Sequence, residues 1–174
     1  MARACGTCTL CCKVMKIAVL GKPVDRWCPH CAVGRGCAIY ADRPGECAAF
    51  TCVWLSTPGL GEEWRPARCK IVLVYDERDN HLVAHVEAGN AAALKKSPYR
   101  ERLRDWMLAG LPRGGRVYLA VGGHMSLLLP DGEHPLGVPA GDDLVDITKI
   151  ATPVGPRWDV TVRKPKSSGD LPRR

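Results

Sequence analysis

Nine of the ten cysteines in this 174-residue sequence lie within its first 52 residues, at spacings typical of metal ligands. They are Cys5, Cys8, Cys11, Cys12, Cys28, Cys31, Cys37, Cys47 and Cys52. Thiolates bind borderline and soft metal ions well, and two cysteines separated by two residues can direct both sulfurs at one ion from a single turn. We therefore predict that these nine cysteines bind metal.

Other uses of cysteine fit this pattern less well. A disulfide framework needs an oxidising compartment, and residues 1–10 contain no apolar export signal, so we expect a cytoplasmic protein. A catalytic cysteine usually acts singly with a distant histidine, whereas clustered thiols would compete for metal and oxidant. Structural cysteines are scattered through buried strands and helices. Only Cys69, at the edge of an apolar strand, fits that structural use.

The adjacent pair Cys11 and Cys12 indicates more than one metal centre. Two sulfurs on one tetrahedral ion are only about 3.8 Å apart, and adjacent residues rarely direct their side chains that way. One grouping that follows is Cys5, Cys8, Cys28 and Cys31 for one ion, and Cys11 or Cys12 with Cys37, Cys47 and Cys52 for the other. Such closed sites would be structural, and zinc is the ion that we favour. His30 could replace one thiolate.

An iron–sulfur centre is the main alternative to zinc. Cys5, Cys8 and Cys11 have the spacing that begins a ferredoxin-type run, and Cys28-Pro29 could supply the distant cysteine with its proline. That run would place its fourth cysteine where this sequence has Met15, which favours zinc over iron or a [4Fe–4S] cluster. Two closed sites need eight of the ten cysteines, so metal chelation or delivery through a labile site that uses the remaining thiols is a further alternative.

The cysteine motif resembles that of a known family. The motif consists of Cys5-x-x-Cys8-x-x-Cys11-Cys12, Gly36-Cys37-Ala38-Ile39-Tyr40, Arg43-Pro44, Cys47, Phe50 and Cys52. It is similar to the CxxCxxCC family of zinc- or iron-chelating proteins, the YkgJ-like proteins, over about the first third of the chain. The resemblance implies bound metal in a bacterial-type cytoplasmic protein. The family typically has a single cysteine near Cys28, so Cys31 points to an additional or altered site.

The resemblance does not extend to an enzymatic activity. Some flagellin lysine methylases carry a similar cysteine cluster that holds an iron–sulfur centre. Residues 70–174 contain no methyltransferase signature, however, and the sequence has no Gly-rich phosphate loop, H-E-x-x-H motif or nucleophile elbow. We therefore assign no catalytic residue and favour a metal-binding or protein-interaction module over an enzyme.

Composition divides the chain into four parts. We predict a cysteine-rich metal-binding segment at 1–55, a linker at 56–69, an α+β domain at 70–162 and a basic disordered tail at 163–174. The first part has few apolar runs, so its fold should depend on metal. Trp64, within the linker, is expected to pack on the core.

The predicted elements must hold the cysteine segment in place. They are a helix within 10–20, a hairpin of 71–75 and 82–87, a helix from Ser97-Pro98 to Gly110, a second hairpin of 116–121 and 125–129, and weaker strands at 145–150 and 158–162. A turn is expected at Pro130-Asp131-Gly132. This order predicts an α+β fold, in which the metal-stabilised segment packs on a small antiparallel sheet crossed by one main helix.

Charge and hydropathy limit the partners to metal ions and a possible protein. The sequence has no apolar run of 18 residues, so we expect no membrane crossing. The net charge of +7 counts each cysteine as neutral, and eight thiolates on two divalent ions would lower it to about +3. The basic tail contains no aromatic residue, which argues against specific nucleic-acid binding.

Overall fold

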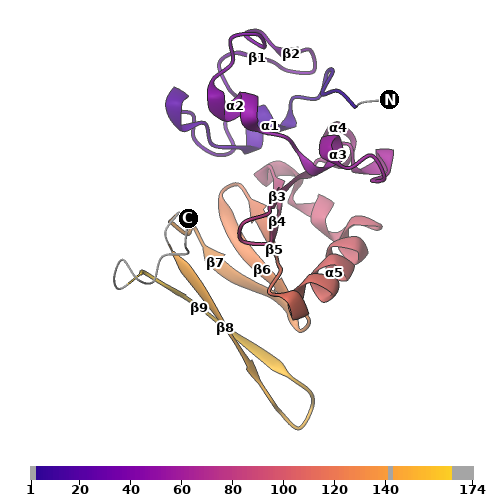
Figure 1. The fold of residues 1–174 in the computed structure, drawn as a ribbon, viewed down its shortest axis with the longest axis vertical. Coiled ribbons are helices and arrows are strands. Elements are labelled where there is room, and N and C mark those ends of the chain that lie inside the picture. Colours follow the sequence, from indigo (N-terminus) through magenta and orange to yellow (C-terminus); the bar gives the residue numbers. More distant parts are fainter. Residues whose placement is uncertain (1–2, 141–142, 166–174) are drawn as a thin grey trace.

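The structure is a computed structural model that describes residues 3–140 and 143–165, and it is a mixture of α-helices and β-strands (Figure 1). The helices are α1 Leu10–Val14, η1 Ala18–Leu20, α2 Gly45–Ala49, α3 Val53–Ser56, η2 Glu62–Trp64, α4 Pro66–Cys69, η3 Ala88–Lys95, α5 Tyr99–Gly110 and η4 Leu111–Arg113. The strands are β1 Cys31–Ala32, β2 Gly36–Cys37, β3 Val72–Asp76, β4 His81–Val86, β5 Arg116–Val121, β6 His124–Leu129, β7 Gly132–Gly137, β8 Leu144–Ile150 and β9 Arg157–Arg163. The α+β class is confirmed.

The main sheet has five strands in the order β3-β4-β5-β6-β7. Both predicted hairpins, β3–β4 and β5–β6, are present and antiparallel. Strands β4 and β5 are parallel, because η3 and α5 carry the chain back across the sheet between them. The sheet is therefore mixed: three of its four strand pairs are antiparallel as predicted, and the β4–β5 pair is parallel. Sequence analysis also missed β7, because its glycines and Pro135 weaken a strand pattern.

Helix α5 covers one face of this sheet, where Leu103 and Met107 enter the main apolar core. Tyr99, Leu103 and Met107 follow helical spacing, so the predicted main helix is confirmed. Its start differs by one residue: Pro98, not Ser97, is the N-cap, and the Ser97–Pro98 peptide bond is cis.

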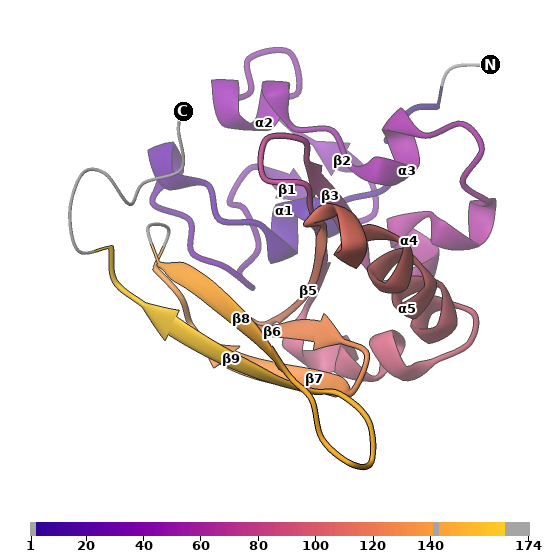
Figure 2. The same cartoon turned by 60° about the horizontal axis from the view of Figure 1, so that its bottom comes forward.

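The two-stranded sheet β8–β9 covers part of the opposite face (Figure 2). Its apolar side chains pack on a second cluster built from Tyr118, Leu127 and Leu129. Strand β9 ends at Arg163, one residue beyond the predicted boundary of the domain. Residues 166–174, most of the predicted tail, lie outside the described part of the chain.

Short elements between residues 10 and 69 join the cysteine segment to the sheet. Helices α1 and α3 both pack against β3, and their Val14 and Trp54 belong to the same core as Ile71. Residues 56–69 are not a plain linker, since they contain η2 and α4. Trp64 is 2% exposed there and packs against the rings of Tyr99 and Trp106, so its predicted place in the core is confirmed.

The helix predicted within residues 10–20 is shorter than expected. Helix α1 already contains Cys11 and Cys12 and ends at Val14, after which Met15 is extended. Residues 17–22 then form a loop that is closed by two main-chain hydrogen bonds between Ile17 and Lys22. None of the described helices has the length and apolar character needed to cross a membrane.

Candidate metal centre

Cysteines from separate elements surround one open cavity of about 910 Å³ in the N-terminal segment. Those that line it are Cys5, Cys8, Cys11, Cys12, Cys28, Cys37 and Cys47. They come from the chain before α1, from α1 itself, from the loop before β1, from β2 and from α2. The fold therefore gathers thiols that are up to 42 positions apart in the sequence around one space.

Two of the C-x-x-C sequences, Cys5 to Cys8 and Cys28 to Cys31, form tight turns. The Cys8 N–H donates to the Cys5 carbonyl over 2.9 Å, and the Cys31 N–H donates to the Cys28 carbonyl over 3.0 Å. Gly6, within the first turn, has φ +53°, a conformation that costs glycine little. These short-range hydrogen bonds explain why the two-residue spacing brings each pair of thiols to one side of the chain.

The second turn lies against helix α1. The Cys28 N–H donates to the Cys12 carbonyl over 3.0 Å, and Cys31 pairs across the β1–β2 ribbon with Cys37. Directly opposed residues of an antiparallel pair share one face, so Cys31 and Cys37 lie on the same side. Contact with the Cys11 thiol, followed by burial, raises the pKa of Cys12, while Cys31 and Lys22 act in the opposite direction.

The strongest electrostatic interactions group the cysteines into two neighbourhoods. Burial raises the pKa of Cys5, and Cys52 and Cys8 are its next strongest causes, with a smaller contribution from Cys12. Burial also raises the pKa of Cys47, with contributions from Cys12, Cys28 and Cys37. We define the first neighbourhood as Cys5, Cys8 and Cys52, and the second as Cys11, Cys12, Cys28, Cys31, Cys37 and Cys47.

This arrangement differs from the grouping expected from spacing. That grouping placed Cys28 and Cys31 with Cys5 and Cys8, whereas burial and the nearby Cys12 raise the pKa of Cys31 to about 11. The difference arises because the hydrogen bond from Cys28 to Cys12 returns the 28–31 turn to α1.

The cysteines fit a metal in donor type but do not form a completed coordination group. All ten are free thiols. Within residues 3–140 and 143–165, no group of three or more Cys, His, Asp or Glu side chains is arranged to hold an ion. A thiol loses its proton when it coordinates, and the cation then attracts sulfurs that otherwise repel one another. The donor set therefore suits a soft or borderline ion.

The two residues whose role the sequence left open lie in different places. His30 lines the cavity, and its carbonyl accepts the Ala38 N–H. Cys69 is buried in the main core, where its sulfur accepts the Ile71 N–H over 3.3 Å. Cys69 is not a lining residue of the cavity, so its position fits a structural thiol.

Sequence analysis missed Arg3, which fixes the chain just before the first cysteine. Its guanidinium donates to the carbonyls of Trp54, Thr57, Pro58 and Leu60, and it lies 4.7 Å from the centroid of the Trp54 ring. These contacts connect the first described residues to α3, which begins directly after Cys52. A lone arginine near the N-terminus carries no sequence signal for such a role.

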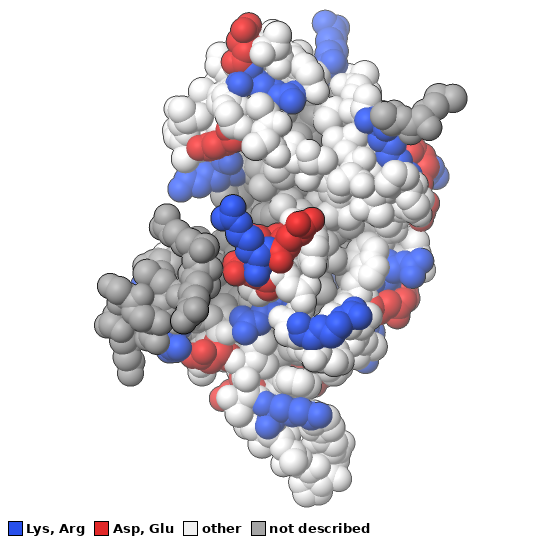
Figure 3. Space-filling model, viewed as in Figure 1, with Lys and Arg blue, Asp and Glu red and all other residues white. Residues whose placement is uncertain are grey.

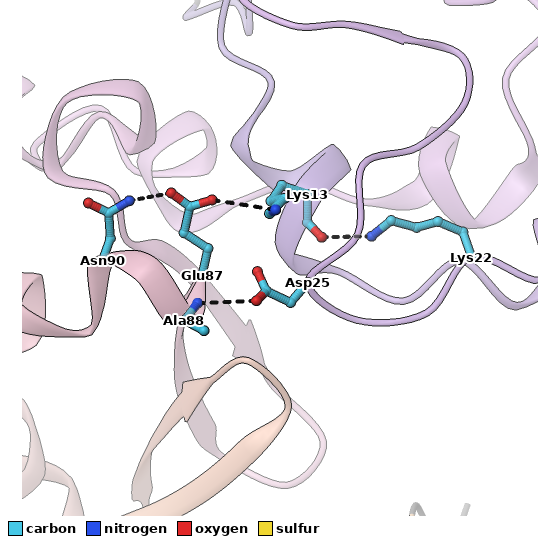
Figure 4. A network of polar contacts seen from close by, with 6 residues as sticks. All are labelled: Lys13, Lys22, Asp25, Glu87, Ala88 and Asn90. Atoms are coloured by element: carbon cyan, nitrogen blue, oxygen red, sulfur yellow. Dashed lines mark hydrogen bonds and ion pairs between the residues drawn. The ribbon is translucent and has the colours of Figure 1, made fainter.

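Sequence analysis also missed a polar network between the cysteine segment and the sheet (Figure 4). Lys13 lies 4.0 Å from Glu87, and Asp25 accepts the Ala88 N–H over 3.2 Å. Lys22 reaches the Lys13 carbonyl at the end of α1 over 2.8 Å. These contacts hold the segment that carries Cys11, Cys12 and Cys28 against the end of β4.

Surface charge is mixed on the face drawn in Figure 3. Lys and Arg side chains lie there among Asp and Glu side chains. The described residues on this face therefore form no continuous basic surface that would follow a nucleic-acid backbone.

Comparisons with known proteins give this chain no relative. No protein-family model, no curated protein and no solved structure matches it. The resemblance to the CxxCxxCC family thus stays a prediction that rests on the cysteine motif.

Proposed function

We propose that this protein binds metal through two thiolate-rich centres, most simply zinc, and has a structural or protein-interaction role. One observation carries the proposal: seven cysteines from five separate stretches of the chain line one cavity. The first neighbourhood would supply one centre and the second neighbourhood the other. Membership of the CxxCxxCC family is part of the same proposal.

Metal would act here as a cross-link. It would supply bonds between stretches of chain that are otherwise joined by turns and a two-residue ribbon. The side chains of the two neighbourhoods would hold it, and their thiols must stay reduced to do so. A reducing compartment such as the cytoplasm is therefore part of the proposal.

An iron–sulfur cluster is the second candidate, and the continuity of the cavity favours it. Thiols of both neighbourhoods border one space, and a multinuclear cluster would use such a space more fully than a single ion. A labile site for metal chelation or delivery is also compatible with this cavity, because the chain has more thiols than two closed sites need.

Elemental analysis of aerobically and anaerobically purified protein tests the proposal. We expect a colourless protein with about two zinc ions per chain. A brown anaerobic protein that contains iron and acid-labile sulfide would show that the bound group is an iron–sulfur cluster and not zinc. Absence of bound metal from both preparations would refute the proposal.

A matched pair of variants locates the metal. Cys8→Ala removes one of the three thiols of the first neighbourhood, at the cavity, and should lower the metal content by about one ion per chain. Cys69→Ala removes a thiol in the core and should leave the metal content unchanged. Equal metal contents in the two variants would contradict the assignment of the ligands.

A further inference from the structure

Lys22 is the only buried charged residue in the described part of the chain, with 4% of its surface exposed. Its main chain is fixed by hydrogen bonds of 3.0 Å in both directions with Ile17. Its ammonium group donates to the carbonyls of Lys13 and Met15, which follow the cysteine pair at the end of α1. The position of this positive charge is therefore set by both its main chain and its side chain, and Figure 4 shows the contact of the side chain with the Lys13 carbonyl.

A buried ammonium needs a compensating negative charge. Moving it out of water is unfavourable, and neutral carbonyls replace only part of its hydration. Burial lowers the pKa of Lys22, and Cys28, Cys12, Cys11 and then Asp25 oppose that shift. Asp25 does not form an ion pair with Lys22 within the described residues. Because the ammonium lies on the carbonyls of Lys13 and Met15, one and three residues after Cys12, ionised Cys11 and Cys12 thiols would supply negative charge at this end of α1.

We propose that Lys22 is a positioning residue of the second neighbourhood, where it serves as the buried counter-cation of a thiolate-bound metal and holds the end of the helix that carries Cys11 and Cys12. This inference rests on the proposed function. A divalent ion with four thiolates has a formal charge of about −2, which a fixed positive charge stabilises. No hydrogen bond joins Lys22 to a thiol in the described residues, so this stabilisation acts through space.

Lys16 is a positive side chain of the same segment that differs from Lys22 in exposure. Lys16 lines the cavity, which Lys22 does not, and it is exposed, so water and salt screen its charge. Lys16→Met is therefore a matched control, because it removes the same charge from the same segment. Residues outside the metal ligands that orient a site typically contribute 10- to 100-fold to metal affinity, and we expect Lys22 to lie in this range.

Chelator competition with zinc tests the role of Lys22. We expect Lys22→Met to weaken zinc binding by about 10- to 100-fold at both low and high salt, and Lys16→Met to weaken it by less than about threefold, with the effect vanishing at high salt. Lys22→Arg keeps the charge and should retain most of the affinity. Equal affinities of wild type and Lys22→Met would overturn the inference while leaving the proposed function intact, whereas failure of the wild type to bind zinc would refute both.

Lys22→Gln separates charge from hydrogen bonding, since an amide can still donate to a carbonyl. If Lys22→Gln binds zinc as tightly as the wild type, the side chain acts only through its hydrogen bonds to the end of α1, and the counter-cation role is overturned. Hydrogen exchange of β5 in each metal-free variant reports whether the sheet is folded. If Lys22→Met does not fold, the comparison between Lys22→Gln and Lys22→Arg carries the same test.

Discussion

The cysteine segment and the sheet domain differ in how many of their residues are buried. In the sheet domain, Ile71, Ala84 and Leu127 are completely buried, and main-sheet strands of five or six residues pack beneath α5. In the cysteine segment, helices have at most five residues, strands have two, and Cys28 is the only buried residue between 23 and 51. So few buried residues cannot offset the entropy of ordering this stretch. Apolar burial therefore orders the sheet domain, whereas residues 23–51 bury little, which is why we propose that metal cross-links them.

Removal of metal should have the largest effect, and it should be confined to one region. We expect a strong chelator under reducing conditions to increase hydrogen exchange in residues 23–51 by several orders of magnitude, because the ordering bonds are lost. Exchange in β4 and β5 should change little. The measurement is hydrogen exchange with mass spectrometry, before and after chelation. Uniform protection throughout the metal-free chain would remove the distinction between the two regions.

A substitution in the apolar core of the sheet domain should lower the stability of the protein more than one in the cysteine segment. Leu127→Ala removes a completely buried side chain beneath β8–β9 and should lower the free energy of unfolding by about 2–5 kcal/mol. Val33→Ala, in an exposed part of the cysteine segment, should change it by less than about 0.5 kcal/mol. Urea denaturation of the metal-loaded proteins provides both values. A similar loss in both variants would show that the two regions do not differ as described.

Acid should weaken the sheet domain through His85. Burial lowers the pKa of His85 to about 4, well below its ordinary value of 6.5, so the unfolded chain binds more protons between these pH values. The free energy of unfolding should therefore fall as the pH decreases from about 6.5 towards 4, by about 2 kcal/mol at pH 5. Burial also lowers the pKa of His81, which adds a change of the same sign.

Urea denaturation of the metal-free protein at pH 7.5 and pH 5 measures this dependence. His85→Gln cannot titrate and should show a smaller loss of stability than the wild type. Metal-free protein is used for both, since acid would also release metal from thiolates. An identical pH dependence of wild type and His85→Gln would show that another group is responsible.

The sequence by itself determined the features that depend on neighbouring residues. Apolar runs on either side of Gly122-Gly123 predicted the β5–β6 hairpin, and both glycines have the positive φ values that such a turn requires. Helical spacing predicted α5, and the C-x-x-C spacing predicted turns that hydrogen bonds of about 3 Å close. Short-range sterics and hydrogen bonds decide these features.

Only the tertiary structure decided which distant segments meet. The parallel pairing of β4 with β5, the position of Cys52 near Cys5 and the burial of Lys22 beside the second neighbourhood have no local signature. The nine candidate ligands could be named from their type and spacing, but their neighbours could not. Strand partners and electrostatic neighbours follow from long-range packing, in which α1 and α3 dock on β3 and seven of the nine cysteines come to line one cavity.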